Sequence, residues 1–234
     1  MAAQIEKPIS EGMKRARKAR LEVGLSADQP SEVFAEVAKF GVTAVRRPFA
    51  ARNVSGMYVF RKDLNRGVAI VNSTDIQSRQ RFTLAHELAH HLFDQDSVFV
   101  ENLVQGERNP VESRANAFAA EYLLPEATVR RWKPSAPWAE SPNDVARLAL
   151  HFGISLEAAA WRLVTANLIV SVDVILSCRE TVDADLRSRL LEGNDENLDL
   201  PPEFVDLVED AARQARISEK KRRELLGKDG PSDR

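Results

Sequence analysis

The sequence is poor in cysteine, in aromatic residues and in net charge. The single cysteine, Cys178, excludes an intrachain disulfide framework and fits a reducing cytoplasm. The formal net charge is −2, so no overall field attracts the chain to nucleic acid or to a membrane. The first residues lack an apolar signal core, and the apolar stretch 168–176 is interrupted by Ser171 and Asp173 and is too short to span a bilayer. We therefore expect a cytoplasmic protein.

Histidine is also rare, and three of the four histidines fall within RFTLAHELAHH, residues 81–91. His86 and His90 are four residues apart, so on a helix both imidazoles can reach one ion. Glu87 then lies beside the metal without ligating it, which is the arrangement that binds Zn²⁺ and deprotonates its water. Apolar residues at helical spacing predict an amphipathic helix here, with Ser78 as its N-cap. An ordinary buried histidine pair is disfavoured, because burying two imidazoles without partners costs free energy.

A catalytic zinc site needs a third protein ligand and an open position. The extended motif would require glycine at 93 and histidine at 96, where this chain has Phe93 and Asp96. The sequence therefore leaves six candidates: Asp96, Glu101, Glu107, Glu112, Glu121 and Glu126. We favour Glu112, in a helix predicted from Pro110 to Leu124 with Asn109 as its N-cap. A capping box is the alternative explanation for Glu112. Glu121 is the next candidate, but it lies on a different helix face, where we expect a surface residue or a residue that supports the ligands.

Further side chains are assigned on spacing or chemistry. Asn116 lies four residues after Glu112 on the same face, and its amide oxygen can accept a hydrogen bond from a ligand histidine. His91 points to another face and is interpreted as a solvent-facing or structural residue. Tyr122 and His151 are candidates for the oxyanion donor on their chemistry alone.

Three ordered segments resemble the ImmA/IrrE family of bacterial and phage metallopeptidases. They are GVAIVNSTDIQSRQRFTLAHELAHHLF, ESRANAFAAEYLLP and VARLALHFGISLEAAAWRL. The resemblance covers about residues 30–170. It implies a gluzincin-like site with one Zn²⁺ per chain, and it maps the third ligand to Glu112. It also implies a protease that cuts a helix-turn-helix repressor in phage, mobile-element or stress regulation.

Periodicity and turn signals give the expected organisation. Helices are predicted at 9–23, 30–40, 126–133, 142–152 and 155–166, the last with Trp161 and Leu163 packed inside, and strands at Val42–Arg47, Gly56–Phe60 and Gly67–Asn72. The fold class is thus α+β: a mainly helical, zincin-like metallopeptidase domain with a small three-stranded sheet before the His-Glu-x-x-His helix, plus a C-terminal helical extension. We expect residues 1–170 to form the metallopeptidase domain. Residues 171–234 form the extension, with a polar linker at 190–202 and one charged helix from Pro202 to about Leu226, whose apolar face carries Phe204, Leu207, Val208 and Ala211.

Two other function classes remain open. The protein could act stoichiometrically, sequestering a repressor or toxin with zinc as a structural staple, in which case Asp96 could close the site as a fourth ligand. Basic runs at residues 14–20 and 220–223 could contact phosphates, but a solvated helix face is the usual explanation, so direct DNA binding is not favoured.

Overall fold

A computed structural model describes residues 2–49, 54–61, 65–94, 99–102, 109–192, 200 and 202–226. Its centre is a mixed sheet in the order β1-β3-β2-β4, formed by β1 Val42–Arg47, β3 Arg66–Asn72, β2 Val54–Arg61 and β4 Phe99–Asn102. Strand β1 runs parallel to β3, while β2 pairs antiparallel with both of its neighbours. The predicted three-stranded sheet is confirmed as β1 to β3, and the short edge strand β4 was missed.

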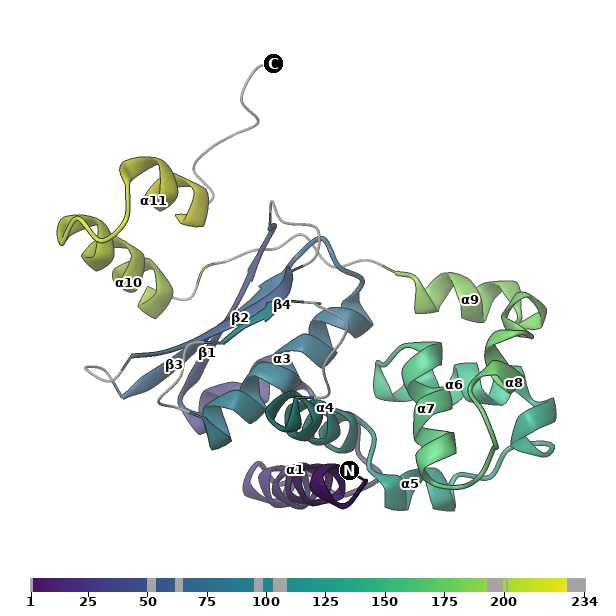
Figure 1. Ribbon diagram of the computed structural model, residues 1–234. Coiled ribbons are helices and arrows are strands. Elements are labelled where there is room, and N and C mark those ends of the chain that lie inside the picture. The colour runs from purple at the N-terminus through teal and green to yellow at the C-terminus, as the bar shows by residue number, and fades with distance from the viewer. Residues whose placement is uncertain are drawn as a thin grey trace.

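The helices stack below this sheet as successive layers (Figure 1). Helix α3, Gln77–Phe93, lies against one sheet face, α4, Pro110–Leu123, packs on α3, and α1, Ala2–Glu22, packs on α4. Asn109 caps α4, since its side chain accepts from the N–H of Val111, as predicted. Ser78 is not the N-cap of α3: Ile76 occupies that position and makes no side-chain cap bond.

Helix α1 begins earlier than predicted and approaches α4 very closely. A Cβ added to Gly12 would lie 2.3 Å from the main-chain oxygen of Arg114. Ala16 and Ala19 on the same helix are fully buried. Small residues on α1 therefore let two helix backbones come together, and this contact fixes where α4 lies below α3.

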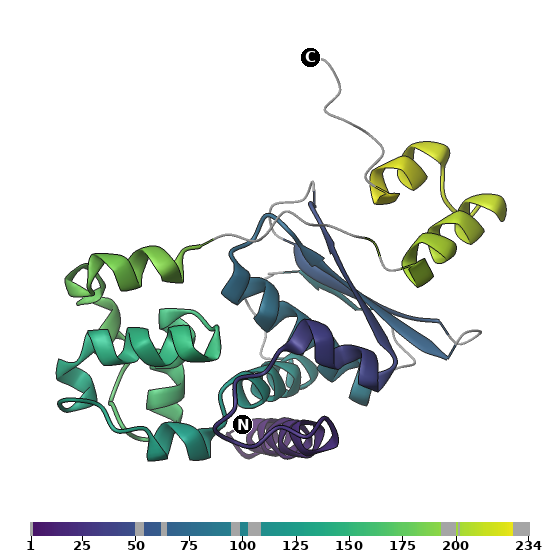
Figure 2. The same cartoon turned by 180° about the vertical axis from the view of Figure 1, so that it is seen from behind.

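The remaining helices connect or flank these layers. The helix predicted at 30–40 is a short α2, Val33–Glu36, continued by the 3-10 helix η1, Val37–Phe40, and closed by Gly41 at φ 77°. A helical lobe follows α4 on one side of the molecule (Figures 1 and 2), and it contains α5 Glu126–Arg131, η2 Trp138–Glu140, α6 Pro142–Phe152, α7 Leu156–Thr165, α8 Asp173–Leu176, η3 Arg179–Thr181 and α9 Ala184–Leu190. Leu163 is buried as predicted, but Trp161 is 51% exposed, so its predicted packing is wrong. Ile175 belongs to the main core.

The C-terminal segment contains two helices where one was predicted. Helix α10, Pro202–Arg213, and helix α11, Glu219–Leu226, are separated at Ala215, whose φ is 54°. Phe204 and Val208 are buried against Val45 and Val68, on the sheet face opposite α3. The side chain of Leu207 lies outside the described residues. Among the described residues, no helix has the length and apolar character needed to cross a membrane.

Candidate metal centre

The site is built on two successive turns of α3. His86 and His90 are each about 1% exposed, and their Nε2 atoms face each other at 3.0 Å. The helix places them on one face because four residues make slightly more than one turn. Both imidazoles therefore present the same ring nitrogen to one point.

Glu112 on α4 completes the cluster. Its carboxylate oxygens lie 3.1 Å from Nε2 of His86 and 3.7 Å from Nε2 of His90. The carboxylate thus points to the two imidazoles, which a capping role toward Asn109 would not require. The side chain of Glu112 is 38% exposed, whereas both histidines are buried. The cluster is consequently accessible from the Glu112 side.

The outer nitrogens of the two imidazoles have their own acceptors. Nδ1 of His86 donates to Oδ1 of Asn116 at 2.9 Å, and Nδ1 of His90 donates to Oδ2 of Asp94 at 3.2 Å. Asp94 is held in turn by Nη2 of Arg114 at 2.5 Å. An imidazole whose Nδ1 carries the proton offers a lone pair at Nε2. These contacts therefore orient both lone pairs inward.

The three donors fit a zinc ion. The Nε2 lone pairs of the two histidines and the carboxylate of Glu112 repel one another unless a positive charge lies between them. A proton can bridge only two of these groups, whereas a metal ion can bind all three. Two ligands at about 2.05 Å from a tetrahedral ion lie about 3.3 Å apart, and the observed separations of 3.0, 3.1 and 3.7 Å fall around that value. Among the described residues, His86, His90 and Glu112 are the group found with one ligand atom each within 4.8 Å of the others.

The protonation states also suit a metal. Burial, with the neighbouring His86, lowers the pKa of His90 to about 4. The neighbouring His86 lowers the pKa of Glu112 below its ordinary value, against a smaller opposing effect of burial. At neutral pH the site therefore offers a neutral imidazole at His90 and a carboxylate at Glu112, which are the forms that bind zinc.

Glu87 follows His86 and is fully buried. Its position depends on close contact with strand β2: a Cβ added to Gly56 would lie 2.9 Å from Oε1 of Glu87. Burial, together with the charge of Glu87, raises the pKa of Tyr58 on the same strand. The carboxylate is thus held between α3 and the sheet, beside the first histidine and outside the ligand cluster.

His91 has a structural environment. It is 4% exposed, its Nε2 donates to the main-chain oxygen of Phe40 at 2.8 Å, and its Nδ1 accepts from the Tyr58 hydroxyl at 2.7 Å. Burial lowers the pKa of His91. Of the two predicted roles, the structural one agrees with this geometry and the solvent-facing one is wrong.

Two residues suggested by chemistry alone do not lie at the cluster. Tyr122 is fully buried and its hydroxyl donates to Oε2 of Glu36 at 2.7 Å. It stands ten residues after Glu112 on α4, about 15 Å further along the axis. His151 is on α6, where its ring packs between Trp132 and Phe152. Neither can serve as the oxyanion donor in this arrangement.

The other acidic candidates are accounted for as follows. Glu121 is not a surface residue: it is 1% exposed and binds Arg17 at 2.7 Å and Arg162 at 2.5 Å, which joins α1, α4 and α7. Glu126 pairs with Arg130 on α5. Asp96, Glu107 and the side chain of Glu101 lie outside the described residues.

The sequence reasoning missed Asp94 and Arg114. A signal for Asp94 was present, because it lies four residues after His90 on the same face of α3. Arg114 had no comparable signal. Its guanidinium reaches Asp94 across the interface of α3 and α4 and also lies over the Phe93 ring at 4.3 Å.

The comparison with protein families agrees with this geometry. The peptidase family model described as the IrrE N-terminal-like domain matches residues 37–164, slightly more than half of the chain. The matched range contains β1 to β4, α3 with both histidines, and α4 with Glu112. No curated protein matches the chain.

Proposed function

The chain belongs to the peptidase family of the IrrE N-terminal-like domain, and from this premise we propose that it is a zinc-dependent endopeptidase that cleaves a helix-turn-helix repressor. The observation that carries the catalytic part is the convergence of His86, His90 and Glu112 beside the buried carboxylate of Glu87. A structural zinc site normally has four protein ligands, whereas a catalytic site has three and an open position.

Different residues of the chain would bind the metal, orient its ligands and transfer the proton during peptide hydrolysis. His86, His90 and Glu112 would hold the zinc, and Asn116 and Asp94 would keep the two imidazoles in the binding tautomer. Zinc supplies a Lewis acid that polarises a peptide carbonyl and acidifies water. Glu87 accepts the proton of the attacking water and transfers it to the leaving amine. The contact with Gly56 holds Glu87 in place for both transfers.

The substrate part of the proposal is supported by the family resemblance. Cutting a repressor of this class would release transcription, as suits a phage, a mobile element or a stress system. Such a substrate occurs in the cytoplasm, which agrees with the location expected from the cysteine content. In the alternative function, stoichiometric sequestration of a repressor or toxin, zinc would only stabilise the fold, and Glu87 would have no role.

The test is incubation of the zinc-loaded protein with a helix-turn-helix repressor of the same genome, followed by intact mass measurement. Glu87→Gln is expected to retain zinc and to cut at least about 10²-fold more slowly, because a general base contributes about 10²–10⁴. Glu140→Gln, on the exposed surface, is the matched control and should cut like the wild type. A repressor that is bound tightly but left intact by the zinc-loaded wild type would favour the stoichiometric alternative.

A further inference from the structure

Strand β1 forms an open edge of the sheet. The main-chain oxygens of Gly41 and Arg47 accept hydrogen bonds from the N–H groups of Gly67 and Ser73, at 3.0 and 2.9 Å. The odd-numbered residues of this segment therefore direct their main-chain N–H and C=O groups toward β3. The main chains of Val42, Ala44 and Arg46 consequently face the other way. In the part of the chain that the structure describes, no strand pairs with that side. An open edge is a template for strand addition.

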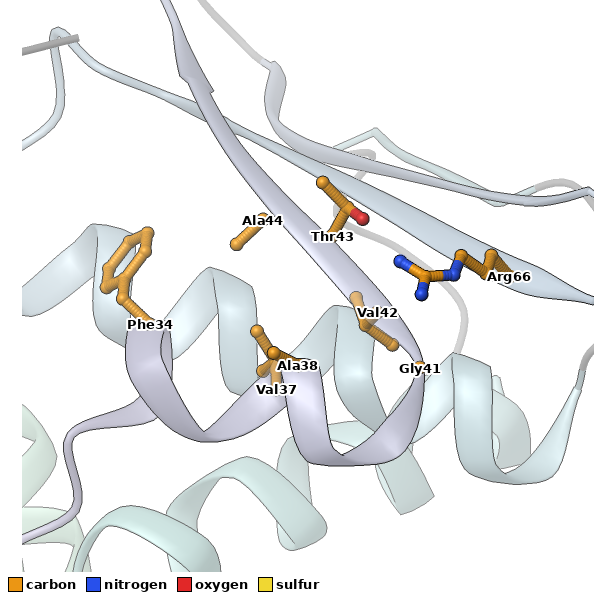
Figure 3. Close-up of a pocket in the computed structure, with 8 residues that line it drawn as sticks. All are labelled: Phe34, Val37, Ala38, Gly41, Val42, Thr43, Ala44 and Arg66. Atoms are coloured by element: carbon orange, nitrogen blue, oxygen red, sulfur yellow. The ribbon is translucent and has the colours of Figure 1, made fainter. Parts of the chain in front are cut away.

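A pocket of about 200 Å³ lies along this edge (Figure 3). The strand forms one wall, and Phe34, Val37 and Ala38 of the α2–η1 segment form the other. Small-molecule sites usually measure about 300–1,000 Å³. The pocket is therefore better suited to one or two side chains of an extended peptide than to a cofactor.

Two arginines, Arg46 and Arg66, flank the edge. The guanidinium of Arg46 lies 3.7 Å from the centroid of the Phe34 ring, at one end of the pocket. Burial, with the nearby Arg81, lowers the pKa of Arg46. Arg66, which lines the pocket beside Thr43, is exposed. Within the described residues neither arginine makes an ion pair, whereas Arg81 pairs with Glu32. Both cations can therefore accept a carboxylate from a partner.

We propose that the β1 edge binds an extended acidic segment of the protein substrate by strand addition. The outward N–H and C=O groups of Val42 and Ala44 would pair with the main chain of the segment. An apolar side chain would enter the pocket, and carboxylates would meet Arg46 and Arg66. The identity of the partner as the substrate rests on the proposed peptidase function. Glu87 of the metal centre lies against Gly56 of β2, and β3 separates β2 from β1, so the β1 edge is a separate docking site for the substrate.

A second copy of the chain is a poorer occupant of this edge. Pairing two β1 strands would bring two copies of Arg46 and two of Arg66 into one small interface. Like charges placed together oppose association, and no carboxylate of the described residues forms an ion pair with either arginine. The charge of the edge thus favours an acidic peptide.

The test uses the zinc-loaded, full-length Glu87→Gln protein as bait for a phage-displayed library of random 12-residue peptides. We expect enriched sequences in which Asp or Glu alternate with apolar residues. A synthetic copy of the leading peptide is then measured by fluorescence anisotropy. Arg46→Glu with Arg66→Glu should weaken its binding at least tenfold. Ala44→Pro should do the same, because proline removes an outward N–H that an edge strand does not need for folding. Arg216→Glu is the matched charge-reversal control, since Arg216 is exposed on the α10–α11 connection and should leave binding unchanged.

Each other outcome overturns the docking proposal. It fails if no sequence is enriched, if the peptides lack acidic residues, or if they bind the folded variants as tightly as the parent. A concentration-dependent dimer in sedimentation that Ala44→Pro abolishes would assign the edge to a second copy. Because the bait is the inactive Glu87→Gln protein, the selection reports peptide binding alone and can be interpreted even if no repressor is cleaved. Conversely, if the arginine double variant with Glu87 intact cuts a repressor at the wild-type rate, the docking site is refuted while the peptidase function stands.

Discussion

Gly56→Ala should separate catalysis from metal binding. An ideal Cβ at this position in β2 would lie 2.3 Å from Cγ2 of Thr83 and 2.9 Å from Oε1 of Glu87. Carbon atoms are normally about 3.5–4.0 Å apart, so the first contact overlaps by more than about 1 Å. Either strand β2 moves away from α3, or the two side chains are displaced.

The expected magnitudes follow from these contacts. Thr83 is 2% exposed, and overpacking a buried position costs about 1–3 kcal/mol of folding stability. A displacement of about 1 Å in a reacting group can lower the rate about 10²-fold. The three atoms nearest to the new methyl group belong to Thr83, Glu87 and Ile70 and not to the ligands His86, His90 and Glu112, so zinc affinity should change by no more than a few-fold. We therefore expect a folded, zinc-loaded and slow enzyme.

The assay combines urea unfolding, zinc content and kcat/KM for repressor cleavage. A companion change, Thr83→Ser, removes Cγ2 but leaves Glu87 beside the new methyl group. In the Gly56→Ala background it should restore much of the lost stability and little of the lost activity. Wild-type activity in the single variant, or activity that recovers together with stability in the double variant, would refute the idea that this contact holds Glu87.

Two further predictions concern the surroundings of the ligands. Asp94→Asn removes the charge that orients His90 and binds Arg114, so zinc affinity, measured by competition with a chromophoric chelator, should fall roughly 10- to 100-fold; unchanged affinity would show that Asp94 does not position the ligand. Stability of the metal-free protein should decrease as the pH falls from about 6.5 toward 4, because burial lowers the pKa values of His90 and His91, so the unfolded chain takes up their protons at a higher pH than the folded chain does. Each histidine contributes up to about 1.4 kcal/mol per pH unit, so chemical unfolding of His91→Gln between pH 7 and 5 should give a shallower decrease than the wild type, and parallel curves would contradict a neutral, buried His91.

The sequence predicts the local part of the site well. The helical repeat relates His86 to His90 and Glu112 to Asn116 within each helix, and the structure brings the two pairs together. Asn109 and Pro125 mark the ends of α4 through their own backbone preferences. Such features depend on a few neighbouring residues, so a pattern in the chain is enough to find them.

Features that depend on distant contacts were missed or wrongly placed. Tyr122 was chosen for its hydroxyl, but the hydroxyl is used by Glu36, eighty-six residues earlier. Glu121 was expected to be a surface residue or a residue supporting the ligands, but its partners Arg17 and Arg162 lie on other helices. Strand β4 has only four residues and exists through its pairing with β2. No periodicity in the sequence encodes any of these pairings.

The position of the third ligand depends on a helix outside the family match. Glu112 reaches the histidines only if α4 lies at the right height and angle below α3. Gly12 of α1 sets that position by admitting the backbone of Arg114, two residues from the ligand, and the Arg17–Glu121 ion pair ties the far end of α4 to the same helix. The matched range begins at residue 37, whereas α1 ends at Glu22. The matched range therefore contains the candidate metal ligands, and α1 supplies part of the geometry that brings Glu112 to the two histidines.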